Sequence, residues 1–407
     1  MRILVAESKW TGHHLFFAAG IAEALADDDH EIVLAVTNSG EENPRRMVDL
    51  AVAGLPRNIS IRTSLPGPPA GFARIGDRDG AIERTTIECE VAEVDPDVVV
   101  VPSGDALAFH LGGGGRGSRL NAPEIRMVLH QPYIGYGDRG WRFAAKRELI
   151  RHRLRRLRPG LAAIDHRIAR SLGPGRGVAL IPDPPAPSES TSPAEARLRF
   201  DVPAEHRIFL AAGEHSTRKG TDRLLDCWPR DRDDRTTLLV VGRCTDAVRR
   251  AVEMRRDDLD ARRIVLLDRI LDVQTHLDAF RAADVITACY PQHFGASGIL
   301  NTAVAMGRPM IGSDYGCIGD TIRAFGLGAT LDCRNPERMC SALPRLVASP
   351  PTLDPVRSRP LARFHTIENR RRVLRSWILD ETSPESPPIP FPPFPEAAGG
   401  SLPGTSP

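Results

Sequence analysis

Short apolar runs alternate with longer amphipathic stretches through the first half of the chain. Residues 14–26 have the apolar spacing of a helix and lie between two such runs. Strands that alternate with helices are typical of a parallel sheet that is covered on both faces. The runs that predict buried strands in this half are residues 2–6, 32–36, 98–101 and 125–129.

The same alternation resumes after a proline-rich stretch, residues 181–188, which cannot continue a regular element and reads as a linker. The pattern therefore predicts a second parallel α/β unit, followed by a last helix over residues 366–379. The strands expected in this unit are residues 208–212, 238–241, 264–267, 285–288 and 309–312.

Four segments follow from this pattern. We expect a fold of two Rossmann-like domains, with a helical segment that packs back on the first domain. The end of the chain is rich in Pro, Gly and Ser and predicts a disordered tail. The expected bounds are 1–182 for the first domain, 183–345 for the second, 346–381 for the helical segment and 382–407 for the tail.

Composition agrees with a globular protein of this size. The chain has 407 residues, of which 41% are hydrophobic and 26% charged, and its net charge is +2. That charge predicts no general attraction to nucleic acid. The seven cysteines are scattered, so we expect neither a disulfide framework nor a zinc site. The first residues enter a strand pattern without a signal-peptide core, which favours a cytoplasmic location.

One basic segment is relevant to whether the protein contacts a membrane. No apolar run reaches the roughly 20 residues that a membrane span needs. Residues 144–158 combine many arginines with leucines and isoleucine at helical spacing. Such a helix could lie on anionic lipid as a peripheral contact. A packed helix with a solvated basic face is the favoured interpretation.

The first segment with readable chemistry follows the strand at residues 208–212. The strand leads into Gly213, a polar loop, Arg218-Lys219-Gly220 and then a helix from Thr221. Cations at the carboxyl end of a strand, next to the start of a helix, suit a phosphate group. A solvated loop before an ordinary helix is the alternative.

A second segment strengthens the phosphate interpretation. A loop containing Phe294-Gly295 and ending at Ser297-Gly298 precedes a helix of small and apolar residues from Ile299 to Met306. Small residues let a diphosphate approach the unpaired N–H groups of a helix start, where the helix dipole favours negative charge. The sequence contains no P-loop and no Gly-x-Gly-x-x-Gly after its first strand, which argues against a common ATPase or dehydrogenase.

These segments as a set resemble the retaining glycosyltransferases of family 4 (glycosyltransferase group 1), which have the GT-B fold. The resemblance covers roughly residues 1–380. It rests on Gly213, Lys219-Gly220, Phe294-Gly295, residues 303–311 (Ala-Val-Ala-Met-Gly-Arg-Pro-Met-Ile) and Ser313-Asp-Tyr-Gly316, with Gly12 in the first half. It implies a nucleotide diphosphate sugar as donor, transfer with retention, and no metal or other cofactor.

The resemblance also implies the roles of individual residues. Lys219, with Arg218, would neutralise the donor diphosphate and so stabilise the leaving group. Gly12 would approach the same phosphates from the first domain. Arg269 and Leu271 would meet the nucleobase. The remaining donor-binding positions are Gln292, His293, Gly295, Ser297, Gly298, Ile299 and Thr302.

Two departures from the family pattern affect the sugar site. Family members usually have a glutamate on each side of the Phe-Gly loop, and here these positions are Gln292 and Thr302. Both can hydrogen-bond hydroxyls, but neither supplies a carboxylate. Glu214 also stands where an arginine often follows the glycine. A weak or inactive nucleotide-binding protein and a sugar-nucleotide epimerase on the same fold therefore stay open as alternatives.

The first domain offers one candidate for catalysis. His130 follows the strand at residues 125–129, where the family often has a histidine near the donor sugar and acceptor. It could bind the sugar or assist proton movement, and a histidine hydrogen-bonded in a loop is its alternative. His13 and His14 are weaker candidates, and His110 is weaker still. The acceptor, which could be a glycan, a lipid or a small molecule, cannot be read from the sequence.

Overall fold

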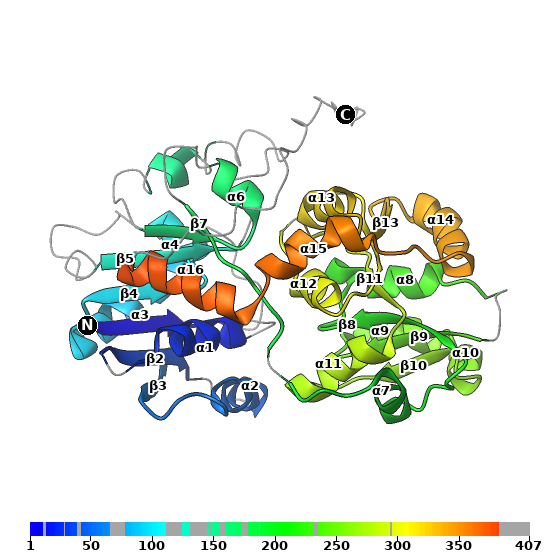
Figure 1. Ribbon diagram of the computed structural model, residues 1–407, viewed down its shortest axis with the longest axis horizontal. Helices are drawn as coiled ribbons and strands as arrows, with labels where there is room; N and C mark the ends of the chain where they lie inside the picture. The colour runs from blue at the N-terminus through cyan, green and yellow to red at the C-terminus, as the bar shows by residue number, and fades with distance from the viewer. Residues whose placement is uncertain are drawn as a thin grey trace.

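The computed structural model consists of two α/β units that lie side by side (Figure 1). Each unit contains one parallel sheet with helices on both faces, as the alternating pattern predicts. The structure describes residues 1–10, 14–27, 29–38, 42–65, 78–110, 124–130, 145, 148–152, 154, 160–171, 178–186, 188–230, 235–293 and 295–381.

The first sheet has the strand order β3-β2-β1-β4-β5-β6-β7 among the described residues. Its central strands are buried on both faces, because apolar clusters lie above and below it. The strands are β1 (Arg2–Glu7), β2 (Glu31–Thr37), β3 (Ile59–Leu65), β4 (Val98–Val101), β5 (Glu124–Leu129), β6 (Gly160–Ala163) and β7 (Ala179–Leu180). The helices are α1 (His14–Leu25), α2 (Glu42–Val52), α3 (Arg78–Val94), α4 (Asp105–His110) and α6 (His166–Ser171).

The second sheet has the order β10-β9-β8-β11-β12-β13 and again packs between two apolar clusters. Its strands are β8 (Arg207–Ala212), β9 (Thr236–Val241), β10 (Ile264–Leu267), β11 (Val285–Ala288), β12 (Met310–Ser313) and β13 (Gly328–Leu331). The helical elements are α7 (Pro193–Arg199), η3 (Thr217–Lys219), α8 (Thr221–Cys227), α9 (Asp246–Glu253), α10 (Arg256–Asp260), α11 (Val273–Ala282), α12 (Gly298–Ala305), α13 (Gly316–Phe325) and α14 (Pro336–Ala348).

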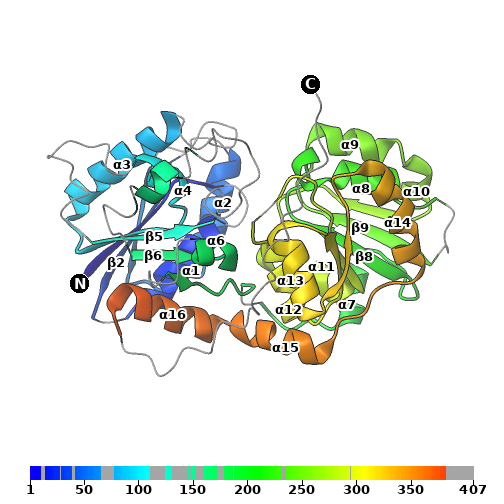
Figure 2. The same ribbon diagram turned by 90° about the horizontal axis from the view of Figure 1, so that it is seen from above.

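Two last helices return the chain from the second unit to the first (Figure 2). Helix α15 (Pro355–Phe364) lies against the second unit, and α16 (Ile367–Leu379) packs on α1. Leu374, Trp377 and Ile378 of α16 are part of the apolar cluster of the first unit. Arg375 adds an ion pair to Asp27 at 2.9 Å. The two units are thus connected by two chain segments, the linker after β7 and the turn between α15 and α16.

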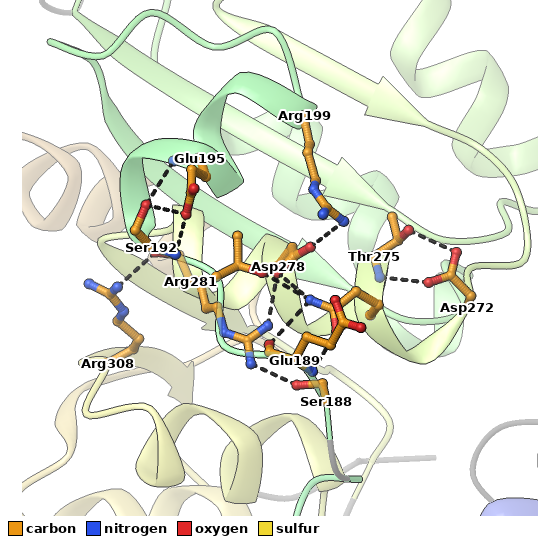
Figure 3. A network of polar contacts seen from close by, with 12 residues as sticks. Ser188, Glu189, Ser192, Glu195, Arg199, Asp272, Thr275, Asp278, Arg281 and Arg308 are labelled. Atoms are coloured by element: carbon orange, nitrogen blue, oxygen red, sulfur yellow. Dashed lines mark hydrogen bonds and ion pairs between the residues drawn. The ribbon is translucent and has the colours of Figure 1, made fainter. Parts of the chain in front are cut away.

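The linker is fixed to the second unit by a polar network around Asp278 of α11 (Figure 3). The buried Asp278 carboxylate lies 2.6 Å from the Arg199 guanidinium and 2.8 Å from that of Arg281. Gln274 donates to the same carboxylate at 3.0 Å, and its side-chain oxygen accepts the backbone N–H of Glu189 at 2.9 Å. A buried carboxylate requires such partners, because desolvation without them is costly.

Nine strands lie where the apolar runs predicted them, within one or two residues. Four strands were missed: β3, β6, β7 and β13. Strand β3 lies at the sheet edge and is buried only at its two end residues, and β7 has only two residues. Strands β6 and β13 are four residues long and contain glycine, alanine or threonine. Such segments take their strand conformation from neighbouring strands rather than from their own pattern.

One disulfide is present, although the scattered cysteines predicted no disulfide framework. Cys227 of α8 and Cys340 of α14 form a disulfide, with a Cα–Cα distance of 4.4 Å. The two residues are 113 positions apart, so the pairing depends on the packing of the two helices and is invisible in local spacing.

The structure describes only part of the basic segment, residues 144–158. Ile150 and Leu154 pack into the core of the first unit, as one face of a packed helix would. Its other described side chains include the exposed Leu149. Among the described residues, no helix combines the length and apolar character needed to cross a membrane.

Candidate functional site

The carboxyl ends of both sheets carry loops that meet across the two units. Trp10, three residues after β1, lies under the Arg243 guanidinium, which is 5.7 Å from the ring centroid. Arg243 follows the carboxyl end of β9. Ala296, in the loop before α12, packs against the apolar cluster of the first unit. Ligands of open α/β sheets bind at the carboxyl ends of strands, so the facing loops define the candidate site.

Gly213, at the carboxyl end of β8, is the point where the two segments predicted to bind phosphate converge. Its φ of 101° is a conformation that favours glycine. A Cβ at this position would lie 3.2 Å from the Lys219 Nζ and 3.8 Å from the Ile299 Cδ1. The structure therefore brings together the end of β8, Lys219 and the first turn of α12, as the two sequence segments suggested.

Lys219 ends the short helix η3, and the charged groups near it are Arg218 and Glu214. Its ammonium lies 5.4 Å from the ring centroid of Tyr290. Burial, reinforced by the neighbouring Arg218 charge, lowers the pKa of Lys219 to about 8. No carboxylate among the described residues lies within ion-pair distance of this ammonium. The Glu214 charge raises the Lys219 pKa but does not offset burial, so a dianionic ligand would supply the counter-charge that favours the ammonium.

Arg218 connects this cation to the loop before α12. Its Nη1 donates to the His293 Nδ1 at 3.2 Å, and the His293 Nε2 donates to the Ala296 carbonyl at 3.0 Å. The His293 ring also meets Tyr290 edge-on, with 5.6 Å between centroids. Burial lowers the pKa of Arg218, which still remains a cation at neutral pH. The contacts of His293 are thus those of a packed loop histidine next to the predicted donor site.

A buried histidine fixes the start of α8 behind the cations. The His215 Nδ1 lies 3.0 Å from the Thr221 hydroxyl, and its Nε2 donates to the Val241 carbonyl at 3.0 Å. Burial lowers the pKa of His215 to about 4, so the ring is neutral near pH 7. The loop from β8 to α8 is therefore held by neutral hydrogen bonds and does not add a third positive charge.

Helix α12 begins near Gly213, and its first backbone N–H groups are at this end of the helix. Ser297 is its N-cap but makes no capping bond with its side chain; its hydroxyl interacts instead with the Tyr290 phenol. The first N–H groups of a helix have no partner within the helix and favour an anion. Ser297, Gly298 and Ile299 lie at this helix start, with Gly295 buried in the preceding loop.

The two positions that replace the family's glutamates differ in their surroundings. Gln292 is exposed in the loop after β11. Thr302 is buried, and its hydroxyl donates to the Gly298 carbonyl at 2.8 Å within α12. Of these two side chains, only Gln292 can therefore reach a sugar without first giving up an internal hydrogen bond.

The predicted base-binding residues lie in the loop after β10. Arg269 is exposed, while Leu271 is half-buried against the core of the second unit. Asp268 holds this loop to the loop after β9, because its carboxylate accepts the Cys244 N–H and the Arg249 Nε–H, each at 2.7 Å. Arg269 and Leu271 therefore stand at the same sheet edge as Gly213 but come from a separate loop.

Two residues that the sequence interpretation missed lie beside these elements. The Asp183 carboxylate accepts from Asn301 of α12 at 3.3 Å and would lie 3.6 Å from a Cβ at Gly298. Arg243 lies 3.4 Å from Glu214, the residue that replaces the usual arginine. The Gly242-Arg243 pair directly after a strand was the only local signal for Arg243. Asp183 had none, because it belongs to the linker.

In the first unit, His130 is 8% exposed and follows β5. Its ring Nε2 donates to the Pro102 carbonyl at 2.6 Å, and its backbone N–H donates to the Asp105 carboxylate at 3.0 Å. The ring packs edge-on against Phe17 at 5.1 Å and lies 5.4 Å from the His14 ring. His130 is thus a hydrogen-bonded, buried histidine behind His14. Gly12 and Phe294 lie outside the described residues.

One group of side chains has the composition of a metal site. Ligand atoms of Asp165, His166 and Cys317 all lie within 4.8 Å of one another, and the three residues are buried where the two units meet. Burial raises the pKa of the Cys317 thiol well above its usual range. Metals bind the thiolate, so this environment favours a hydrogen-bonded thiol over a metal ligand. Next to it, Arg167 and Asp320 form an ion pair between the units.

Comparison with known proteins identifies the second unit. Residues 206–349 match the family model described as glycosyl transferases group 1. No curated protein sequence matches the chain at a significant level. Together, the family match and the paired parallel sheets define the class of protein, a glycosyltransferase with the GT-B fold.

Solved structures of this fold match nearly the whole chain. Sucrose-phosphate synthase from Thermosynechococcus elongatus is 15% identical, with a TM-score of 0.59 over 93% of this chain and 95% of its own. HepE from Anabaena, in complex with UDP and glucose, is 12% identical, with a TM-score of 0.60 over 93% and 98%. WaaG, a glycosyltransferase of lipopolysaccharide biosynthesis, is 15% identical, with a TM-score of 0.60 over 92% and 97%.

Proposed function

We propose that the protein transfers a sugar from a nucleotide diphosphate sugar to an acceptor hydroxyl, with retention and without a metal ion. The observation that carries the proposal is the convergence of Lys219 and the α12 start at Gly213. Arg218, bonded to the loop before α12, adds a second cation. The diphosphate would lie between these cations and the N–H groups of Ser297 to Ile299.

This arrangement provides what the reaction requires. Cleavage of the sugar–phosphate bond places negative charge on the leaving nucleoside diphosphate. Two cations and a helix start can stabilise that charge in an environment where water is partly excluded. Because Lys219 and Arg218 already supply positive charge, the proposal needs no divalent ion. Retention is inferred from the family resemblance.

The structural relatives support the choice of donor class. HepE has been crystallised with UDP and glucose, which motivates UDP and UDP-sugars as first probes. The proposed acceptor is an alcohol. Sugar discrimination would involve Gln292, together with Asp183, the carboxylate next to the start of α12.

Calorimetry with UDP, ADP, GDP and dTDP tests the donor site directly. Lys219→Ala should weaken the preferred nucleotide by roughly 10- to 100-fold, because a charge-assisted hydrogen bond is lost. Arg250→Ala, at an exposed position of α9, is the control and should bind as the wild type does. Equal affinity of the Lys219→Ala variant would remove this residue from the site, and absence of binding by the wild type would overturn the proposal.

Product analysis then separates transfer from the alternatives. Incubation of the wild type with a bound nucleotide sugar should release nucleoside diphosphate faster when an acceptor alcohol is added. Conversion of the sugar nucleotide to an isomer without acceptor would instead identify an epimerase. Binding without any turnover, across a panel of donors and alcohols, would identify a nucleotide-binding protein that lacks activity.

A further inference from the structure

Glu214 and Arg243 face each other just beyond the ends of strands β8 and β9. The parallel pairing of the two strands continues past their ends to a bridge between His215 and Cys244, and the His215 N–H donates to the Arg243 carbonyl at 2.8 Å. The loops after the two strands are therefore held side by side. Across them, the Arg243 Nη2 donates to the Glu214 Oε1 at 3.4 Å.

The Glu214 carboxylate also acts on the two cations of the proposed donor site. Burial lowers the pKa of Lys219 to about 8 and also lowers that of Arg218, and the Glu214 charge opposes both changes. Among the described residues, Glu214 is the one carboxylate that does so. Three cations, Arg218, Lys219 and Arg243, thus share a single carboxylate, and the group keeps an excess of positive charge.

The two members of the Glu214–Arg243 pair are held differently. In the part of the chain that the structure describes, Arg243 is the one hydrogen-bond partner of the Glu214 side chain. Both side chains are partly exposed, so the pair contributes little free energy to holding the carboxylate in place. Arg243 has a second contact, because its guanidinium lies 5.7 Å from the ring centroid of Trp10 in the first unit. Rotation of the Glu214 side chain would therefore leave Arg243 supported by Trp10.

A diphosphate and the Glu214 carboxylate compete for the same cations. Like charges that lie close together repel each other, and the repulsion is stronger where water is partly excluded. The diphosphate carries the higher charge and can accept hydrogen bonds from several cations at once, so it can replace the carboxylate. A nucleoside without phosphate carries no negative charge and has no such competition.

We propose that Glu214 is a resident counter-ion of the donor site: a nucleoside diphosphate displaces its carboxylate, and Arg243 then becomes a third cation on the ligand. The inference rests on the donor site proposed above and concerns how tightly that site holds its ligand. The apparent affinity is reduced by the fraction of molecules in which Glu214 occupies the cations. The nucleoside diphosphate released by transfer is therefore held less tightly than the cations alone would hold it, which limits inhibition by product.

Glu214→Gln tests the counter-ion by calorimetry on the full chain. The titrant is the nucleoside diphosphate that the wild type prefers among UDP, ADP, GDP and dTDP. The variant keeps the shape of the side chain without its charge, so the affinity should rise roughly five- to tenfold. The affinity for the corresponding nucleoside should not change. Glu253→Gln removes the same charge from an exposed position of α9 and should bind as the wild type does. Equal affinity of Glu214→Gln and the wild type would overturn the proposal.

Arg243→Ala, made in the Glu214→Gln background, tests the third cation. Because Glu214 is neutral in this background, an effect of Arg243 on the ligand cannot arise from the ion pair. The affinity for the same diphosphate should fall roughly tenfold, as expected for one lost charge-assisted hydrogen bond. Arg243→Lys keeps a cation and should lose less, which separates a loss of charge from a loss of folding. If the alanine variant binds as its parent does, Arg243 is not a ligand contact and its role here is refuted.

A crystal structure of the wild type with the bound diphosphate tests the displacement. The Arg243 guanidinium should lie within hydrogen-bond distance of a phosphate oxygen, and Glu214 should no longer contact it. A Glu214–Arg243 pair that persists beside the bound phosphate would contradict the displacement. The proposed donor site stands in either case. Failure of all four nucleoside diphosphates to bind the wild type would instead overturn that site, and this inference with it.

Discussion

At the residue scale, the proposed donor site contains one lysine whose charge is costly to maintain. Lys219 is surrounded by Tyr290, Arg218 and the backbone of β8, without a described carboxylate partner in ion-pair contact. Desolvation opposes a charged ammonium. A bound diphosphate would reverse that balance, since it adds negative charge to a site where Glu214 is the one carboxylate that raises the Lys219 pKa. Nucleotide binding should therefore be linked to the protonation of this residue.

The pKa of Lys219, about 8, leads to a prediction with a defined sign. The ammonium is present below pH 8 and lost above it, so affinity for UDP should fall as pH rises from 7 to 9.5. The decrease should approach tenfold per pH unit above 8, because binding then requires the uptake of one proton. Calorimetry across this range provides the measurement. Lys219→Arg stays cationic, and its affinity should vary little; a similar decrease in that variant would assign the linkage to another group.

Sequence analysis singled out Gly213, Lys219 and the start of α12 because each lies between a strand with a clear apolar pattern and the helix that follows it. It did not find Asp183, Arg243 or the hydrogen bond from Ser103 to Glu7. Ser103 meets Glu7 across 96 positions and Asp183 meets Asn301 across 118. Such contacts are set by which strands are neighbours in a sheet and by how the units face each other. Neither is encoded in the spacing of a local motif.

At the element scale, α12 is expected to hold the diphosphate through its backbone rather than its side chains. Ser297 makes no capping bond, and the next residue, Gly298, is the first residue of the helix. The start of α12 is therefore built differently from that of α11, where the Asp272 side chain accepts the Thr275 N–H. A helix whose N–H groups are left for a ligand fits the role proposed for α12.

Gly298→Pro tests the backbone role of this helix. Proline is well tolerated at the first helical position, and Ser297 has the extended conformation that a following proline requires. The variant should fold normally but lose one N–H donor, which should weaken UDP roughly tenfold. Gly298→Ala keeps the N–H, and its Cβ would meet Asp183 only at an ordinary 3.6 Å. Equal UDP affinity of the two variants, measured by calorimetry, would exclude this N–H from the site.

One physical reason explains which strands could be predicted from the sequence and which could not. The strands found from the sequence, such as β8 and β9, are buried on both faces, so their apolar runs are continuous. The missed strands include β3 and β7 at the edges of the first sheet. Their residues need not be apolar, because one or more of their faces meet solvent or a loop. The pattern therefore predicts the centre of each sheet better than its borders.

At the scale of the whole molecule, the two connections between the units are bonded to each other. The Asp183 N–H in the linker donates to the His365 Nδ1 at 3.0 Å, and His365 lies in the turn between α15 and α16. Arg370 of α16 is buried near both Asp183 and Gly20 of α1. The Asp183 carboxylate also contacts α12 through Asn301. Movement of one unit relative to the other would therefore disturb a contact of the helix proposed to bind the donor.

His365 makes this connection dependent on pH. Burial lowers the pKa of His365 from 6.5 to about 4, so the folded protein keeps the ring neutral. Since an unfolded histidine binds a proton near pH 6.5, this residue contributes stability above that pH and loses it as pH falls from 6.5 toward 4. His365→Asn retains a side-chain acceptor but does not titrate. Its melting temperature, followed by calorimetry, should therefore decrease less steeply over this range than that of the wild type.

His365→Leu tests the bond between the connections at constant pH. Leucine cannot accept from the Asp183 N–H, so the variant should lose about 1–3 kcal/mol of unfolding free energy at pH 7.5. The units should also sample more open arrangements, which small-angle scattering would detect as a larger radius of gyration. His365→Asn should stay close to the wild type in both measurements. If the leucine variant matched the wild type in stability and radius, the two connections would act independently. Asp183 would then not link donor binding at α12 to the turn between α15 and α16.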